Sequence, residues 1–494
     1  MKTTAEKLLP DNKYWYYFLK ICSIPHPSGH EDALRGYLAE EAAKHNLFCR
    51  VDKAGNLAID RPAAAGFENS PVVILQAHLD MVPQQAPGVE FDFLRDPIPV
   101  QLEGDWVTTG GKTTLGADDG MGVALAMELL TAPDLQCGAL RGVFTVSEET
   151  GLGGAEDIAP EFLQADILFN LDSDVTFTIG CAGGSRFTAQ AELECRAADK
   201  SHKAVTLQLK NMLGGHSGVD IHRNVGSAAV VTGKLLAEIS RSGFALSSVL
   251  SGTLANAIAR EAVVCGTVPP EQYAEIAAVI ERYNKELNAE LETAPDTPVT
   301  LTMESSASVP DRVLTPEAQA DLLAVWNLLP HGVLEKECDG STGTSSNLGV
   351  VSGSSGRAWQ FTLLVRSLYD DRRNAVTAEA LKLLHKYGFA GAVDSAYTSW
   401  EPSRESELLE FACKVYKDVL GKEPERFVVH GGLEPGIFCG MNPDLQMLSF
   451  APATCAVHSP QEKLSITDSE NIRKLLRALL EGLRKALFPI RVGT

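Results

Sequence analysis

Histidine and carboxylate side chains recur in five short segments of this chain, and three of the segments follow strand-like apolar runs. The segments are VVILQAHLDMV (72–82), LGADDGMG (115–122), VFTVSEETGLGG (143–154), ILFNLDSD (167–174) and TCAVHSPQEKL (454–464). Imidazole and carboxylate groups are the ligands that zinc and similar divalent ions take. A single His-x-Asp would mean little, but five such segments in this order predict a two-metal hydrolase site.

The first segment carries His78 and, two residues on, Asp80. In an extended chain these two side chains point the same way. A metal-bound imidazole usually donates its other N–H to a carboxylate, which fixes its tautomer. We therefore expect His78 to be a ligand that Asp80 orients. The alternative is that Asp80 is an ordinary turn residue at a strand end.

Two pairs of adjacent carboxylates each have two interpretations. Asp118 and Asp119 precede a helix in a glycine-rich turn, where one could bridge two metals while the other caps the helix; a helix cap alone is the alternative. Glu148 and Glu149 follow a strand-like run. One can hold a metal while its neighbour takes a proton from a metal-bound water, and the alternative is a solvated turn.

Asp172 and His458 are weak signals when each is taken alone, because an isolated histidine or aspartate is more often an ordinary surface or core residue than a metal ligand. Together, however, two histidines and three carboxylates are enough ligands for two metals if one carboxylate bridges them. A bridging water would complete both coordination shells and act as the nucleophile. Asp80 and one glutamate then remain as the orienting group and the base.

Strands alternating with helices must position these residues. Apolar runs at 55–60, 72–76, 142–146 and 167–171 predict buried strands, and 121–130 predicts a helix, which together indicate an α/β architecture. Ligand sites in such sheets lie outside the carboxyl ends of the strands. The residues at 78, 148, 149 and 172 all come just after apolar runs, which predicts one shared site.

The pattern changes near Arg186, where 187–209 alternates polar and apolar residues as in a half-exposed antiparallel sheet. Further helices and strands follow, and this block could hold two similar strand-and-helix units. After Trp400 helices are expected at 406–420 and 468–487. The simplest organisation is a mixed-sheet α/β catalytic domain (1–185 and 394–494) interrupted by an inserted α+β domain (186–393).

The composition of the chain narrows the range of partners and locations to expect. The formal net charge of -21 argues against nucleic acid or an anionic membrane as partner, and 45% hydrophobic residues allow a large core. Ten scattered cysteines without a Cys-x-x-Cys pair suggest reduced thiols. Neither a signal peptide nor an apolar run of membrane-spanning length is evident, so a cytoplasmic location is expected.

The motifs HLDMV, GADDGMG, SEETGLGGA, NLDSD and GGHSGVDIHRN (214–224) resemble those of the co-catalytic di-zinc exopeptidases, a family that includes aminoacylase-like deacetylases and tripeptidases. Almost the whole chain matches. The resemblance implies hydrolysis of dipeptides, Xaa-His dipeptides such as carnosine above all, by attack of a metal-bridging water. Many members have lysine where this chain has Gly120, a departure that argues against some branches.

The resemblance also implies a site of two Zn²⁺ ions per chain, for which Co²⁺ or Mn²⁺ can substitute. Its assignments are His78 and Asp172 at one zinc, Glu149 and His458 at the other, Asp118 bridging, Asp80 orienting His78, and Glu148 as general base. Asp118 is preferred to Asp119 because members place the bridging aspartate first in Asp-x-x-x-Gly, here 118–122. The peptide bond after that aspartate is often cis in the family.

The inserted block resembles the family's lid domain. His216 would then stabilise the oxyanion, Asn256 and Arg366 would contact the substrate, and Glu434 would meet its ammonium group. The alternatives are an ordinary loop histidine for His216 and an ordinary edge-strand charge for Arg366. A homodimer that binds a small peptide is expected. The alternatives are a tripeptidase, carboxypeptidase or N-deacylase of the same fold and, remotely, a non-catalytic binding protein.

Overall fold

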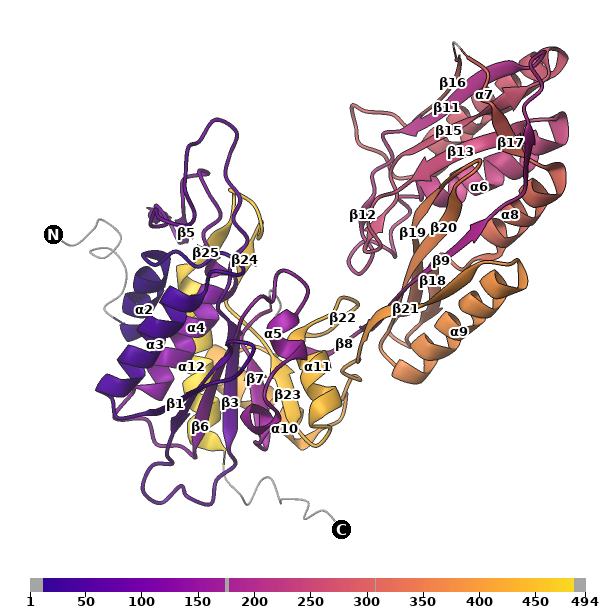
Figure 1. Ribbon diagram of the computed structural model, residues 1–494. Helices are drawn as coiled ribbons and strands as arrows, with labels where there is room; N and C mark the ends of the chain where they lie inside the picture. The colour runs from indigo at the N-terminus through magenta and orange to yellow at the C-terminus, as the bar shows by residue number, and fades with distance from the viewer. Residues whose placement is uncertain (1–11, 174–176, 307, 484–494) are drawn as a thin grey trace. The chain divides into compact units, whose positions relative to one another are not determined.

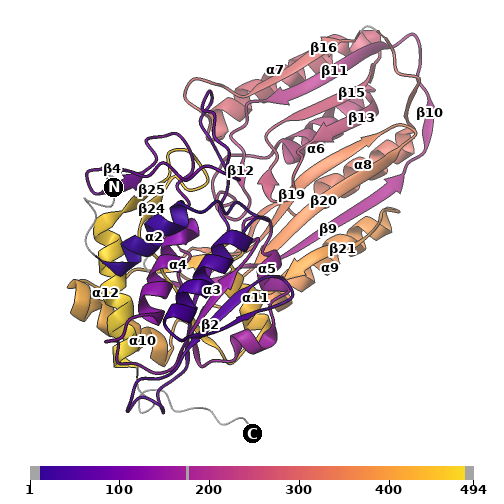
Figure 2. The same ribbon diagram turned by 60° about the vertical axis from the view of Figure 1, so that its left-hand side comes forward.

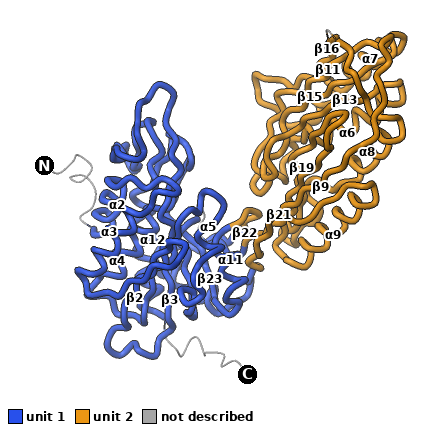
Figure 3. Tube along the Cα trace, in the orientation of Figure 1, with its two compact units in different colours: residues 1–180, 402–428, 433–494 blue, residues 181–401, 429–432 orange. Residues whose placement is uncertain are grey.

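The computed structural model describes residues 12–173, 177–306 and 308–483, and they form two compact units (Figure 3). Unit 1 comprises residues 1–180, 402–428 and 433–494, and unit 2 comprises 181–401 and 429–432. The chain therefore passes between the units near 180 and 401, whereas the sequence placed these changes near 185 and 393. The short return of 429–432 to unit 2 had no signal in the sequence.

Unit 1 is built on a mixed sheet of eight strands in the order β1-β2-β6-β3-β7-β23-β8-β22 (Figure 1). The bounds are β1 (Phe48–Val51), β2 (Leu57–Arg61), β3 (Val73–His78), β6 (Leu140–Thr145), β7 (Ile167–Asn170), β8 (Phe177–Cys181), β22 (Arg426–Val429) and β23 (Gln446–Ser449). Strand β3 runs parallel to both β6 and β7. Every residue of β3 is buried, as its continuous apolar run predicts for a strand covered on both faces.

Helices cover the sheet of unit 1. They are α2 (Lys13–Cys22), α3 (Asp32–Lys44), α4 (Ala117–Leu130), α5 (Gly153–Glu156), α10 (Glu407–Leu420), α11 (Glu434–Met441) and α12 (Ile466–Gly482). Helix α4 packs on β3 and β6, and α2 packs on α4. Residues 23–31 separate α2 from α3. The closing helix ends at Gly482, and the predicted positions 484–487 lie outside the described residues.

A small four-stranded sheet in unit 1 has the order β24-β25-β5-β4. Its strands are β4 (Gln101–Glu103), β5 (Trp106–Thr108), β24 (Thr454–Cys455) and β25 (Lys463–Ser465). The loop between β24 and β25 carries His458. Pairing of β25 with β5 therefore fixes this late segment against a part of the chain that is more than 340 residues earlier.

Unit 2 contains a sheet in the order β16-β11-β15-β13-β19-β20-β9-β21, with β18 paired to β19 (Figure 2). The bounds are β9 (Gly183–Glu192), β11 (Lys203–Lys210), β13 (Ala245–Ser251), β15 (Ala262–Val268), β16 (Thr300–Ser305), β18 (Gly332–Lys336), β19 (Thr342–Ser354), β20 (Ala358–Ser367) and β21 (Ala390–Tyr397). Its neighbouring strands pair antiparallel, as the alternating sequence predicts.

Four helices pack on this sheet: α6 (Ala228–Ile239), α7 (Tyr273–Glu290), α8 (Pro316–Leu328) and α9 (Asp370–Lys386). Burial alternates over part of β11 and β15, so one face of these strands is packed and the other is partly exposed. Whether the block consists of two similar units remains a prediction. Among the described residues, no helix has both the length and the apolar character needed to cross a membrane.

Candidate metal and catalytic site

The ends of three neighbouring strands in unit 1 bring the predicted ligands together. His78 is the last residue of β3, the pair Glu148–Glu149 follows β6, and Asp172 follows β7. Because these strands are parallel neighbours in the order β6-β3-β7, their carboxyl ends share one edge of the sheet. The apolar runs before these residues therefore end at one edge of the sheet.

Asp118 lies between the two predicted histidine ligands. Its Oδ1 is 3.1 Å from Nε2 of His78, and its Oδ2 is 3.2 Å from Nε2 of His458. Nε2 of His458 is also 2.9 Å from Oε1 of Glu149, and Nε2 of His78 is 4.0 Å from Oδ1 of Asp172. A carboxylate with one oxygen toward each of two imidazoles has the arrangement of a group that bridges two cations.

The carboxylate of Asp119 accepts hydrogen bonds from the backbone. Its Oδ2 accepts the backbone N–H of His78 (3.2 Å) and its Oδ1 accepts that of Gly122 (3.2 Å). The peptide bond between Asp118 and Asp119 is cis, as the family resemblance implies. Asp119 also lies within reach of His78 and Asp172. Only Asp118, however, faces both histidines, so the geometry favours Asp118 over Asp119 as the bridging residue.

Asp80 contacts both His78 and the loop that carries the two glutamates. Nδ1 of His78 is 3.0 Å from the backbone carbonyl oxygen of Asp80 and 3.5 Å from its carboxylate. The carboxylate accepts the backbone N–H groups of Glu148 (3.0 Å) and Glu149 (3.2 Å) and the hydroxyl of Ser28 (2.8 Å). Asp80 thus reaches His78 chiefly through its main chain, while its side chain holds the glutamate loop.

The electrostatics of this cluster suit cations. Although burial opposes it, hydrogen bonds with Asp118 and Asp80 raise the pKa of His78 well above its usual value. Asp118 and Glu149 raise the pKa of His458 to about 10. Within the described ranges, no lysine or arginine pairs with the cluster's carboxylates. Imidazole and carboxylate donors that lack a basic partner fit divalent metal ions such as zinc.

Glu148 is half-buried beside this cluster. Burial raises the pKa of its carboxyl group to about 8, with His78 lowering it and the charges of Glu434, Glu149 and Asp118 raising it further. A carboxyl group that titrates near neutral pH can both accept and return a proton. The environment of Glu148 is therefore suited to general acid–base work.

Glu434 lies at the start of α11 and is 1% exposed. Its Oε2 accepts hydrogen bonds from Gln76 (2.5 Å) and Thr145 (3.0 Å), and burial raises its pKa to about 7. Asn170 donates to Gln76 in turn (2.6 Å). The sequence missed the partners of Glu434 because Gln76, Thr145 and Asn170 sit inside apolar strands, where nothing in the local pattern marks them. The predicted contact of Glu434 with substrate remains a prediction.

Three predicted residues cluster in unit 2. His216 forms the short strand β12 (Gly215–His216), and the next residue, Ser217, donates its N–H to the carbonyl of Asn256 (2.8 Å). Arg366 on β20 donates to the hydroxyls of Ser217 (3.4 Å) and Tyr397 (2.6 Å). Burial and the charge of Arg366 lower the pKa of His216.

Arg366 is only 5% exposed and, among the residues that the structure describes, has no carboxylate partner. The expectation that it is an ordinary edge-strand charge is wrong, because β20 lies inside the sheet between β19 and β9. A buried cation without a counter-ion is costly unless an anion joins it. Arg366 is therefore placed to receive an anionic group.

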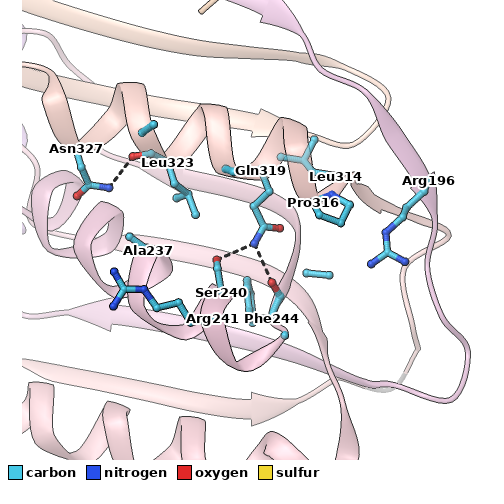
Figure 4. A pocket seen from close by; sticks show the side chains of 14 residues that line it. Arg196, Ala237, Ser240, Arg241, Phe244, Leu314, Pro316, Gln319, Leu323 and Asn327 are labelled. Atoms are coloured by element: carbon cyan, nitrogen blue, oxygen red, sulfur yellow. Dashed lines mark hydrogen bonds between the residues drawn. The ribbon is translucent and has the colours of Figure 1, made fainter.

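A separate cavity of about 580 Å³ lies among α6, α8 and β13 of unit 2 (Figure 4). Gln319 donates to Ser240 (2.7 Å) and to the carbonyl of Phe244 (2.8 Å), and Asn327 donates to the carbonyl of Leu323 (2.8 Å). These amide N–H groups thus have partners within the chain. The cavity contains none of the predicted site residues, and we assign it no part in the chemistry.

Comparison with known proteins agrees with this architecture. Residues 74–482 match peptidase family M20/M25/M40. The cytosol non-specific dipeptidase of Escherichia coli (strain K12) is 34% identical over 474 residues, which cover 95% of this chain and 97% of that protein. The chain therefore belongs to peptidase family M20/M25/M40.

Solved structures show the same fold. The crystal structure of aminoacylhistidine dipeptidase from Vibrio alginolyticus matches with a TM-score of 0.85 and 34% identity, covering 97% of this chain and 98% of that one. Aminopeptidase PepT from Bacillus cereus matches with a TM-score of 0.60 and 15% identity, covering 95% and 97%. At that lower identity the likeness concerns the fold alone.

Proposed function

We propose that this chain is a metal-dependent dipeptidase that hydrolyses unblocked dipeptides, Xaa-His dipeptides such as carnosine among them. The observation that carries the proposal is the placement of Asp118, with one carboxylate oxygen toward His78 and the other toward His458. Membership of the peptidase family and the dipeptidase names of two relatives at 34% identity support it.

Two zinc ions would be held by five residues, and Co²⁺ or Mn²⁺ could replace them. The distances favour His78 and Asp172 at one ion and Glu149 and His458 at the other, with Asp118 between them. When bound, the two ions supply Lewis-acid polarisation of the scissile carbonyl and an activated water. A cytoplasmic location and a homodimer remain part of the proposal; the name of the Escherichia coli relative supports the first.

The chain's own residues would handle the protons. A carboxylate oxygen of Glu148 takes a proton from the attacking water and then returns it to the nitrogen of the leaving amine. Asp80 keeps Glu148 in place by accepting its backbone N–H. His216, whose pKa is lowered by burial and by Arg366, would be a neutral hydrogen-bond donor for the oxyanion.

Substrate binding would use charges at both ends of the dipeptide. Arg366, buried without a carboxylate partner among the described residues, would make paired hydrogen bonds to the free carboxylate, and Asn256 would lie nearby. Glu434 would meet the ammonium group. Recognition of the free ammonium group would separate a dipeptidase from an N-deacylase, because an N-acyl amino acid also has a free carboxylate but no ammonium group.

The proposal is tested by hydrolysis of β-alanyl-histidine, leucyl-histidine, a dipeptide without histidine, triglycine and an N-acetyl amino acid. Each would be added to metal-stripped protein with and without zinc. We expect zinc-dependent cleavage of the dipeptides and none of the other compounds. Cleavage of triglycine or the acetyl compound alone would instead favour a tripeptidase or deacylase. Zinc binding without any cleavage would favour a binding protein.

A further inference from the structure

A buried carboxylate outside the predicted ligand set organises the loop that leads to Asp118. Glu462 precedes β25 and is 2% exposed. Its Oε2 accepts the backbone N–H groups of Leu115 (2.7 Å) and Gly116 (3.2 Å), and its Oε1 accepts those of Ala117 (2.8 Å) and Asp118 (3.3 Å). Four successive amides therefore converge on one side chain.

The backbone N–H groups of this loop need an acceptor from elsewhere in the chain, because the helix that follows cannot provide one. The first N–H groups of a helix have no acceptor within the helix. Here Asp118 and Asp119 have non-helical dihedral angles inside α4, and Gly116 has a φ of +70°. A carboxylate at this position accepts hydrogen bonds from the otherwise unpaired amides. Its negative charge is also stabilised by the positive end of the helix dipole. Glu462 thereby fixes the main chain of Asp118.

The same short segment carries His458, four residues before Glu462. The backbone N–H of Glu462 donates to the carbonyl of Ser459 (3.0 Å), which closes the turn between them. His458 itself has a φ of +59°, a left-handed conformation that is uncommon for residues other than glycine. One segment thus presents an imidazole to Oδ2 of Asp118 and, through Glu462, holds the backbone of that aspartate.

We infer that Glu462 is a positioning residue that sets the distance between Asp118 and His458 and so the affinity of the cluster for divalent cations. This inference rests on the proposed metal site but not on the identity of the substrate. Within the described residues Glu462 pairs with no lysine or arginine, so its carboxylate is committed to the loop. Groups that orient metal ligands typically change metal affinity about 10- to 100-fold when they are altered.

The test is zinc binding by metal-stripped Glu462→Gln, measured by competition with a chromophoric chelator. The glutamine amide can accept with only one atom, and its NH₂ group would face two backbone N–H groups. We expect zinc affinity about 10- to 100-fold weaker than in the unaltered protein. Glu462→Asp, which keeps the charge on a shorter side chain, is the second variant and should weaken binding less.

Glu128→Gln is the matched control, because Glu128 is also a buried carboxylate on α4 but pairs with Arg473 (2.8 Å). It should lower the melting temperature without changing zinc affinity. Zinc affinity of Glu462→Gln within twofold of the unaltered protein, or an equal loss in Glu128→Gln, would overturn the inference. If the unaltered protein binds zinc but cleaves no dipeptide, the proposed activity fails while the effect of Glu462 on affinity is still measured.

Discussion

Glu148→Ala is expected to lower kcat about 10²- to 10⁴-fold while two divalent cations still bind. The variant removes the proton carrier but leaves the backbone N–H of Glu148 on Asp80, so the loop should keep its position. The donor atoms that lie close enough to share an ion include those of His78, Asp118 and Glu149 and none of Glu148. Activity on leucyl-histidine and bound metal per chain are the two measurements.

The control for this variant is Glu156→Ala. Glu156 is an exposed glutamate on α5, which lies, like Glu148, in the connection between β6 and β7. It should keep full activity. Loss of metal from Glu148→Ala would mean that Glu148 is a ligand. Retention of more than a tenth of kcat with metal bound would assign the base to another residue.

Arg366→Ala is expected to lower kcat/KM for dipeptides about 10²- to 10³-fold. Truncating one partner of a buried, hydrogen-bonded charge pair costs about 2–5 kcal/mol. Arg366 is buried, and among the described residues its side-chain partners are only the hydroxyls of Ser217 and Tyr397. The specific readout is the comparison of leucyl-histidine with leucyl-histidinamide, which lacks the free carboxylate. The unaltered protein should prefer the acid strongly, and the variant should treat the two almost alike.

Arg357→Ala provides the control, since Arg357 is exposed in the turn between β19 and β20. Its preference for the acid should be unchanged. If Arg366→Ala still prefers the free acid as strongly as the unaltered protein does, another group reads the substrate carboxylate. A fall in activity that is equal for acid and amide would point to damage of unit 2 instead.

The strand ends were readable from sequence because two simple rules coincide there. Continuous apolar runs mark buried parallel strands, and functional side chains follow the carboxyl ends of such strands. His78, the Glu148–Glu149 pair and Asp172 obey both rules. His458 follows no apolar strand, and only the family resemblance pointed to its place beside Asp118.

What the sequence could not show are contacts between segments far apart in the chain. Glu462 lies about 345 residues after the amides that it accepts, and Glu434 lies 358 residues after Gln76. A glutamate in a polar segment, or a glutamine inside a strand, gives no local sign of such a partner. The kink of α4 at Asp118 and Asp119 was likewise hidden, because the predicted helix at 121–130 begins after it.

The central claim is that two divalent cations on either side of Asp118 are required for peptide hydrolysis. The most direct measurement is a titration of metal-stripped protein with zinc, in which bound metal and the rate of leucyl-histidine hydrolysis are followed together. We predict that activity is absent without metal and reaches its plateau at two equivalents per chain. A plateau at one equivalent, or hydrolysis by the metal-free protein, would contradict the account.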